Sequence, residues 1–239
     1  MQPLAEDPAL DRWLTGVLGE PAAAFMTREG VTWESWRGPQ LTAVEVRELR
    51  QGIDAGVITI DPAGATITGH FDSVKPPYQL FMGYDSGASR PGRVWSWSWR
   101  EGLSQLAFAA ELVLEHGWQP HEVALELAHL DVGVGPAPRQ RPVIAAEVKL
   151  RDSGPQSLAA MLAVFAELAG GRPATWVNKG DRANAVPKYE ELLQLRPPAF
   201  CAVAPGVRRI FDIDYDRDRA MLTPSARPLN RAARARVDD

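Results

Sequence analysis

The sequence predicts an α/β protein of the α+β kind, with a mixed central sheet flanked by helices and a small N-terminal α+β unit. Helix-like and strand-like hydrophobic periodicities alternate through the second half of the 239-residue chain. Residues 143–150 form an apolar run that is typical of a buried strand. Near the N-terminus, a helix-like segment is followed by two β-branched runs around a turn, which predicts a hairpin.

Pro and Gly clusters give the chain its strongest punctuation. Between residues 72 and 92, the runs 75–77 and 86–92 break any regular pattern, so we place a domain boundary there. We expect residues 1–90 to form an N-terminal α+β unit and residues 91–218 to form the core. Residues 219–239 are rich in Arg without a packed pattern, and they are expected to form a basic, flexible C-terminal tail.

In the N-terminal unit, residues 9–18 and 42–55 have helical periodicity. Thr42 followed three residues later by Glu45 is the pattern of a capping box, which predicts a helix beginning there. Strands are expected at 57–60 and 65–68. A helix followed by a hairpin also occurs in winged-helix DNA-binding proteins, but the mixed charges on the helix do not favour that interpretation.

Residues 94–100 alternate strictly and predict a half-buried strand, whose three Trp side chains we expect to fill a core or an interface. Residues 103–116 predict a helix with an inward apolar stripe, and residues 122–132 look extended. The remaining expected elements are the buried strand 143–150, a helix at 156–169, a short helix at 187–195, and strands at 174–177, 200–204 and 208–214.

Composition excludes several classes of protein. The net charge of −4 gives no global basic field for binding long nucleic acid, although a local basic groove is compatible with it. The single Cys201 and the lack of a signal sequence favour a cytoplasmic protein. No apolar run approaches the ~18 residues that span a bilayer. The bias toward Ala, Arg, Gly and Pro favours a bacterial or phage genome.

The buried strand carries two charges on one face, Glu147 and Lys149. A buried charge costs several kcal/mol unless it is compensated or bound to a ligand. We therefore expect Glu147 and Lys149 either to compensate each other or to bind a ligand. Only four of the 26 Lys and Arg residues are Lys, so a Lys in an apolar strand suggests that a compact point charge is wanted there.

Asp131 at the end of the preceding extended segment predicts a metal site. If the two segments pair, two carboxylates and an ammonium meet at one edge of the sheet. Hard cations such as Mg²⁺ accept two carboxylates and keep several waters. Lys149 would then position or activate an attacking water, or stabilise charge on a phosphorus atom. The carbonyl of Val148 would add an oxygen ligand. A plain salt bridge between Glu147 and Lys149 at an exposed edge is the alternative.

At these residues the chain resembles the PD-(D/E)xK superfamily of restriction-endonuclease-like nucleases, whose signature is an Asp at a strand end followed by Glu-x-Lys. Here the pattern is Asp131, then Glu147-Val148-Lys149. The resemblance covers roughly residues 94–214 and implies an αβββαβ core. It also implies a metal-ligating Glu from the first helix, for which we favour Glu111 over Glu115. Only two strands are evident between the two core helices, so either 122–132 is broken in two or the Trp-rich strand takes the third place.

The resemblance implies an enzyme, a Mg²⁺- or Mn²⁺-dependent nuclease, for which DNA rather than RNA is the expected substrate. Asp131, Glu147 and Glu111 would bind the metal, and Lys149 would act on the water. A homodimer is expected where both strands are cut. The first rival is a non-catalytic member of the same fold that binds nucleic acid or assembles with proteins. The second is a bacterial regulatory protein whose N-terminal helix and hairpin bind DNA, with the Glu-x-Lys purely structural.

Overall fold

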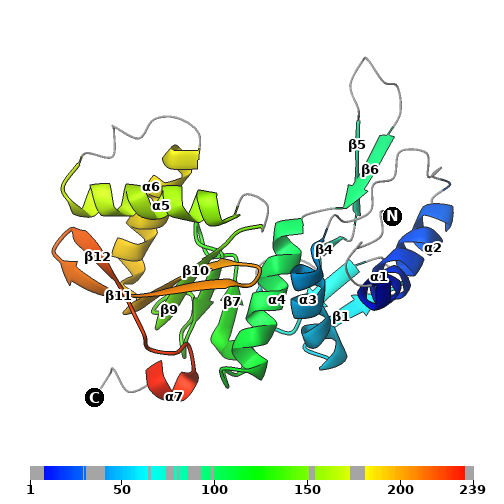
Figure 1. Cartoon of the computed structure of the whole chain (residues 1–239), viewed down its shortest axis with the longest axis horizontal. Coiled ribbons are helices and arrows are strands. Elements are labelled where there is room, and N and C mark those ends of the chain that lie inside the picture. The colour runs from blue at the N-terminus through cyan, green and yellow to red at the C-terminus, as the bar shows by residue number, and fades with distance from the viewer. Residues whose placement is uncertain are drawn as a thin grey trace. The chain divides into compact units, whose positions relative to one another are not determined.

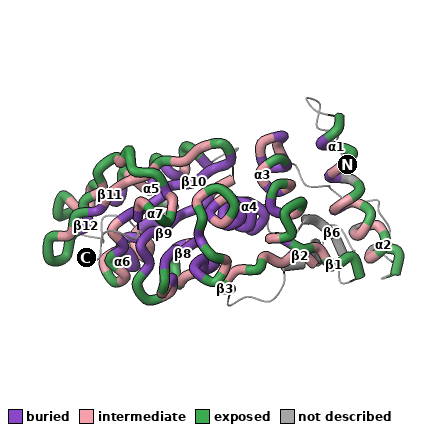
Figure 2. Tube along the Cα trace, turned by 90° about the horizontal axis from the view of Figure 1, so that it is seen from below, coloured by how far each residue is buried: buried purple, intermediate pink, exposed green. Residues whose placement is uncertain are grey.

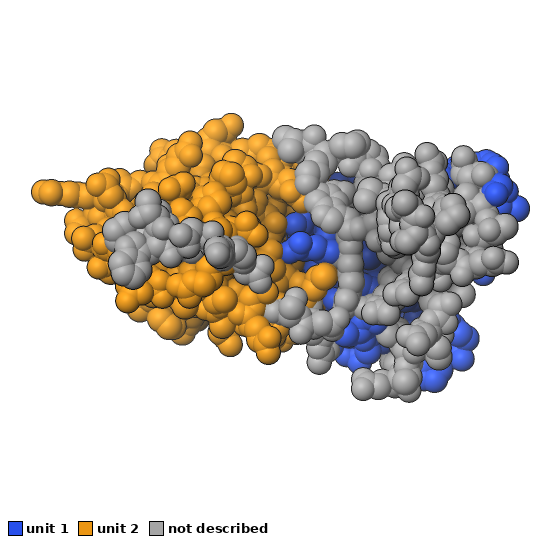
Figure 3. All heavy atoms as spheres, turned by 90° about the horizontal axis from the view of Figure 1, so that it is seen from above, with its two compact units in different colours: residues 1–70, 75–110 blue, residues 71–74, 111–239 orange. Residues whose placement is uncertain are grey.

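The computed structural model describes residues 8–28, 30, 41–63, 66–73, 78–79, 81–85, 93–97, 100–150, 154–172 and 181–234. The chain forms two compact units, one of residues 1–70 with 75–110 and one of residues 71–74 with 111–239 (Figure 3). The boundary therefore differs from the expected one at residue 90. The division between the units falls within helix α4 (Arg100–Leu114), between residues 110 and 111. Residues 71–74 also belong to the second unit.

The first unit contains helices, a three-stranded sheet in the order β1-β2-β4 and a separate β5-β6 hairpin. In chain order its elements are α1 (Pro8–Leu14), the π-helical turn η1 (Thr15–Gly19), α2 (Glu20–Arg28), α3 (Ala43–Asp54), β1 (Ile58–Asp61), β2 (Thr66–Gly69), β4 (Tyr78–Gln79), β5 (Phe81–Asp85), β6 (Arg93–Trp97) and the start of α4.

Local signals in this unit are confirmed. The backbone N–H of Glu45 donates to the Thr42 hydroxyl and the Thr42 N–H donates to the Glu45 carboxylate, which completes the predicted capping box. β1 and β2 pair antiparallel as the predicted hairpin. The Trp-rich strand is present as β6, but its side chains lie outside the described residues, as does the expected strand at 174–177.

The second unit is built on a seven-stranded mixed sheet in the order β12-β11-β10-β9-β8-β7-β3, which confirms the predicted α+β class. β9 and β10 are parallel, and β8 is antiparallel to both of its neighbours. Its elements are β3 (Asp72–Ser73), the end of α4, the 3₁₀ turn η3 (Pro120–Glu122), β7 (Val123–Leu125), β8 (Val132–Val134), β9 (Ile144–Val148), α5 (Gly154–Ala169), α6 (Asp181–Leu195), β10 (Ala199–Ala204), β11 (Val207–Asp216), β12 (Arg219–Pro224) and α7 (Arg231–Arg234).

Helices α5 and α6 pack together along one face of this sheet (Figure 1). All residues of β9 and β10 are buried, as the purple tube shows (Figure 2). Side chains alternate between the two faces of a strand, so Ala145, Phe200 and Ala202 point into the core beneath the helices. That core also contains Leu158, Met161, Val164, Phe165, Tyr189, Leu192 and Ile213. None of the helices among the described residues is long and apolar enough to cross a membrane.

The extended segment expected at 122–132 is broken into β7 and β8. Glu126 has a positive φ of 56°, which ends β7 because the left-handed conformation cannot continue a strand. The N–H of Leu127 then donates to the carbonyl of Leu130 and closes a turn. Three strands therefore separate α4 from α5. Helix α6 is longer than the expected 187–195 and begins at Asp181, with Pro187 inside it.

The expected flexible tail is largely ordered. Residues 219–224 form β12, and α7 follows. The guanidinium of Arg234, only 2% exposed, lies 2.7 Å from Asp212, and the indole N–H of the buried Trp118 donates to the carbonyl of Leu229 at 2.8 Å. The local pattern hid this because each partner lies far away in sequence.

Candidate active site

Asp131 and Glu147 come from neighbouring strands of the sheet. β8 begins at Val132, which pairs with Ala146 of β9, and the N–H of Asp131, just before β8, donates to the carbonyl of the same Ala146 at 3.1 Å. The charge of Glu147 reaches Asp131, since it contributes to the raised pKa of that carboxyl. The structure therefore brings together the two carboxylates that the sequence analysis paired.

Glu147 is the most deeply buried charge of the site, with 0% of its surface exposed, and two ammonium groups compensate it. Lys149 Nζ lies 2.6 Å from Oε1 and Lys188 Nζ lies 2.8 Å from Oε2. Among the residues that the structure describes, no donor makes a well-aligned hydrogen bond to Oε1. Asp131, Glu147, Lys149 and Lys188 form what we call the charged tetrad, whose formal charges cancel. Its lysines are 28% and 16% exposed, so the tetrad is reached from their side.

Asp131 is held by the backbone of the neighbouring strand. The N–H of Val148 donates to its Oδ2 at 2.7 Å. Burial, and then the neighbouring Glu147 carboxylate, raise the pKa of Asp131 well above its usual value despite the opposing effect of Lys149. A further cation beside Asp131 would favour its ionised form. The carbonyl of Val148 points to the same side as its N–H, toward Asp131, because the two groups of one strand residue are parallel.

Helix α6 fixes the loop that precedes Asp131. The carboxylate of Glu191, 6% exposed, accepts hydrogen bonds from the N–H groups of Ala128, His129 and Leu130 at 2.9, 2.7 and 2.6 Å. Lys188 Nζ donates to the carbonyl of His129 at 2.7 Å. Glu191 and Lys188 stand three residues apart, which places them on one side of the helix.

The sequence analysis missed both residues of α6. One signal was present for Lys188, because it is one of only four lysines in an Arg-rich chain and the same scarcity drew attention to Lys149. No local signal identified Glu191, since its three hydrogen bonds reach residues about sixty positions earlier.

The N-terminus of α5 packs beside Lys149. A Cβ atom on Gly154 would lie 3.3 Å from the Lys149 Cβ and 3.1 Å from the Ala204 Cβ, so only glycine allows this approach without displacement. The first turn of a helix presents unpaired N–H groups and a partial positive charge. It adds to the positive potential on the Lys149 side of the tetrad.

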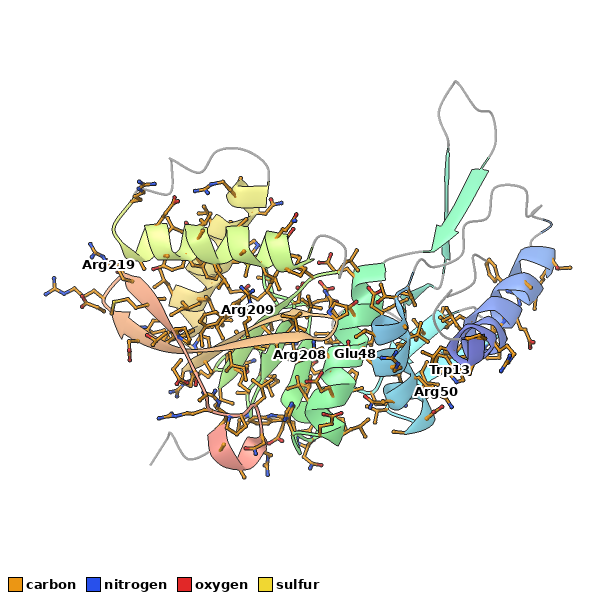
Figure 4. The ribbon with its side chains drawn as sticks, in the orientation of Figure 1. Trp13, Glu48, Arg50, Arg208, Arg209 and Arg219 are labelled. Atoms are coloured by element: carbon orange, nitrogen blue, oxygen red, sulfur yellow. The ribbon has the colours of Figure 1, made fainter. Side chains whose placement is uncertain are left out.

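Glu111 is not brought to the tetrad. Its carboxylate accepts a hydrogen bond from Arg208 Nε at 2.9 Å, and His116 Nε2 lies 3.4 Å from it. Arg208 and Arg209, labelled in Figure 4, lie near the start of β11, and because successive residues of a strand alternate, they point to opposite faces of the sheet. Arg208 is in register with Val203, on the face opposite Ala202 and Glu147. Glu111, the ligand expected from the first helix, therefore forms an ion pair with Arg208 on the face of the sheet opposite the tetrad. The alternative residue, Glu115, is exposed.

Burial by itself raises the pKa of Glu111, but hydrogen bonds from His116 and Arg208 outweigh it and hold that pKa below the usual 4.5. Glu111 is therefore a committed structural anion.

Among the residues that the structure describes, no three His, Cys, Asp or Glu side chains converge as a metal cage. The groups that could hold a cation are the carboxylates of Asp131 and Glu147 and the carbonyl of Val148. Comparison of the chain with family models, with curated proteins and with solved structures finds no match in any of the three.

Proposed function

We propose that this protein is a Mg²⁺- or Mn²⁺-dependent nuclease that hydrolyses phosphodiester bonds, with DNA rather than RNA as the expected substrate. One observation carries the proposal: Asp131 accepts a hydrogen bond from the N–H of Val148, between Glu147 and Lys149, and Lys149 Nζ lies 2.6 Å from Glu147 Oε1. Such a set of one cation and two carboxylates suits a divalent ion beside a phosphate.

The order of elements supports the finer fold assignment, which remains part of the proposal. From α4 through β7, β8 and β9 to α5, the chain follows the αβββα part of the order that the resemblance implies, and helix α6 stands between α5 and the next strand, β10. The Asp lies at the start of the second strand and the Glu-x-Lys at the end of the third. We therefore propose a restriction-endonuclease-like core in the second unit.

The residues present fit a divalent ion. Glu147 Oε1 is buried without a well-aligned donor among the described residues, and burial together with the Glu147 carboxylate raises the pKa of Asp131, which a bound cation would oppose. Asp131, Glu147 and the Val148 carbonyl would hold the ion, with waters completing its shell. When bound, the ion polarises a phosphoryl oxygen and favours ionisation of a nearby water.

The chain's own groups then position the reactants. Lys149 Nζ, partly exposed at the mouth of the tetrad, donates to the attacking water or to an oxygen that gains charge in the transition state. The water oxygen forms a bond to phosphorus while the bond to the leaving sugar oxygen breaks. One hydrogen of the water ends on that leaving oxygen, which leaves a phosphomonoester and a hydroxyl end.

Arg209 is a candidate contact for the nucleic-acid backbone. It is exposed and in register with Ala202, which is in register with Glu147, so all three share one face. Two strand spacings separate Arg209 from Glu147, about 10 Å. Because the chain's net charge is −4, binding depends on such local cations.

A second candidate function is a binding or assembly module without cleavage. The observation that favours it is the neutral tetrad, in which both oxygens of Glu147 already lie beside ammonium groups. A buried ion network of this kind can be purely structural.

Cleavage assays separate the two candidates. We would incubate single-stranded, double-stranded and branched DNA, and RNA, with Mg²⁺ or Mn²⁺ and the wild type, Glu147→Ala, Lys149→Ala or Arg172→Met. Arg172, 61% exposed, follows the far end of the 16-residue α5 and serves as the matched control. The nuclease proposal expects cleavage by the wild type and the control, and none by the two folded site variants. Inactivity of the wild type on every substrate favours the binding module. Light scattering of the active species would test the expected homodimer.

A further inference from the structure

Lys188 holds one of the two oxygens through which Glu147 would bind a metal ion. Its Nζ is 2.8 Å from Glu147 Oε2 and 2.7 Å from the His129 carbonyl. We propose that Lys188 is a place-holding cation: it compensates Glu147 in the metal-free protein, releases Oε2 when the ion binds, and then contacts the substrate phosphate. This inference rests on the proposed nuclease function.

The first step of the argument is competition for oxygen atoms. Ammonium groups lie within 2.8 Å of both oxygens of Glu147, and this carboxylate is completely buried. A divalent ion that binds Glu147 through both oxygens therefore competes with both ammonium groups. Lys149 approaches Oε1 without a well-aligned hydrogen bond, whereas Lys188 makes a regular one to Oε2. Release of Oε2 by Lys188 is thus the step that costs the incoming ion most.

The second step is that Lys188 cannot leave. Its helix is tied to the loop 128–130 by the three hydrogen bonds of Glu191, and its own Nζ bonds to the same loop. A lysine has a flexible stem and three donors, so Nζ can exchange Oε2 for another oxygen nearby while keeping the His129 carbonyl. The ammonium therefore remains beside the ion rather than escaping to solvent.

The third step is charge. The tetrad sums to zero without an ion and to +2 with a divalent one. A phosphodiester carries one negative charge, and the attacking water adds a second as it loses its proton. With Lys188 and a divalent ion, the charge of +2 on the site balances the two negative charges of the phosphodiester and the deprotonated water. Without Lys188 the site carries only +1. This match points to a phosphate oxygen as the new partner of Nζ.

Metal affinity tests the place-holding role without using activity. Isothermal titration with Mn²⁺ would compare the wild type with Lys188→Met, Lys188→Arg, Glu147→Ala and the control Arg172→Met. Removing the competing charge should tighten Mn²⁺ binding about tenfold in Lys188→Met, equal to about 1.4 kcal/mol. Lys188→Arg keeps the charge and should remain within about threefold of the wild type. DNA binding in Ca²⁺, measured by anisotropy, should weaken in Lys188→Met and not in Arg172→Met.

A measurement on the wild type covers the case in which Lys188→Met does not fold. With only four lysines in the chain, ¹⁵N-labelled lysine should give few Nζ signals, and Lys188→Arg assigns one of them. Addition of Mg²⁺ should shift the Lys188 signal, and Mn²⁺ should broaden it.

The outcomes separate the two proposals. Wild-type Mn²⁺ binding that Glu147→Ala abolishes, with no tightening in Lys188→Met and no shift of the Lys188 signal, overturns the place-holding role alone. Mn²⁺ binding that is absent from both the wild type and Lys188→Met overturns the nuclease proposal together with it. Binding by Lys188→Met but not by the wild type supports the place-holding role and argues against metal-dependent cleavage by the natural chain.

Discussion

At the scale of single residues, Glu147 depends on its partners. A carboxylate with no exposed surface is tolerated in β9 because two ammonium groups lie within 2.8 Å of it. Breaking one side of a buried ion pair usually costs about 3–5 kcal/mol, since it leaves charges without compensation. This burial makes the compensated Glu147 a structural requirement of β9.

We therefore expect Glu147→Gln to lower the free energy of unfolding by about 3 kcal/mol in metal-free buffer, measured by urea denaturation. Glu190→Gln, at an exposed position of α6, is the control and should change it by less than about 0.5 kcal/mol. Equal stability of Glu147→Gln and the wild type would show that the tetrad does not compensate this charge.

Glu111 gives a pH dependence of definite sign. Its pKa is lowered in the folded protein by His116 and Arg208 against the effect of burial. A depressed carboxylate pKa contributes stability above the unfolded value, and that contribution is lost as pH falls through the folded pKa. Glu111→Gln should thus be less stable than the wild type at pH 7 by about 2 kcal/mol.

The difference between Glu111→Gln and the wild type should shrink as the pH is lowered below 4.5, because the wild-type carboxyl then takes up a proton. Thermal or urea unfolding from pH 7 to pH 3 measures it. A difference that stays constant over this range contradicts the account of the Glu111–Arg208 pair.

At the scale of elements, α6 acts as the support of the site. Its Glu191 collects three backbone N–H groups from the loop before Asp131, and its Lys188 takes a carbonyl from the same loop. A loop held from both its donors and its acceptors has few alternative conformations. The position of Asp131 therefore depends on a helix that is about sixty residues away in sequence.

Glu191→Gln keeps one acceptor oxygen but replaces the other with an NH₂ group that faces N–H donors. We expect a loss of about 2 kcal/mol in stability, because hydrogen bonds to a charged group are worth about 1.5–3 kcal/mol each. Amide hydrogen exchange at residues 128–130 should accelerate in the variant, while exchange in β10 should stay slow. Unchanged protection of residues 128–130 would mean that Glu191 does not hold the loop.

The elements also show how far the sequence could be interpreted. The capping box of α3, the β1–β2 hairpin and the buried strand β9 were predictable because their signals are local: a side-chain oxygen three residues from its partner, or an apolar run. The break after β7 was not, because Glu126 adopts a positive φ that glutamate rarely takes. The position of Glu111 beside Arg208 was not predictable, because helix periodicity does not tell which face of the sheet a helix covers.

At the scale of the whole molecule, the C-terminal segment is part of the second unit. Arg231 lies 2.9 Å from Glu122, Arg234 pairs with Asp212, and Leu229 accepts from Trp118. The aperiodic arginines suggested a flexible tail. The segment is ordered instead by contacts with carboxylates and an indole N–H that lie far away in sequence. Composition alone could not reveal these partners.

A chain that stops after Pro224 should accordingly lose about 3 kcal/mol of stability, since it leaves the buried Trp118 N–H without its acceptor and removes two ion pairs. Differential scanning calorimetry measures the loss. Trp118→Phe removes the same hydrogen bond from the other side, so adding it to the truncation should cost less than the sum of the two changes. Full additivity would argue against the Trp118–Leu229 contact.

The central claim is that the paired strands β8 and β9 hold a divalent ion between Asp131 and Glu147. Anomalous diffraction from crystals grown with Mn²⁺ tests it most directly. The account predicts a peak about 2.1–2.4 Å from an oxygen of each carboxylate and near the Val148 carbonyl, with Lys188 Nζ moved off Glu147 Oε2. A strong Mn²⁺ signal elsewhere, or no peak while Lys188 remains bonded to Glu147 at saturating Mn²⁺, would contradict it.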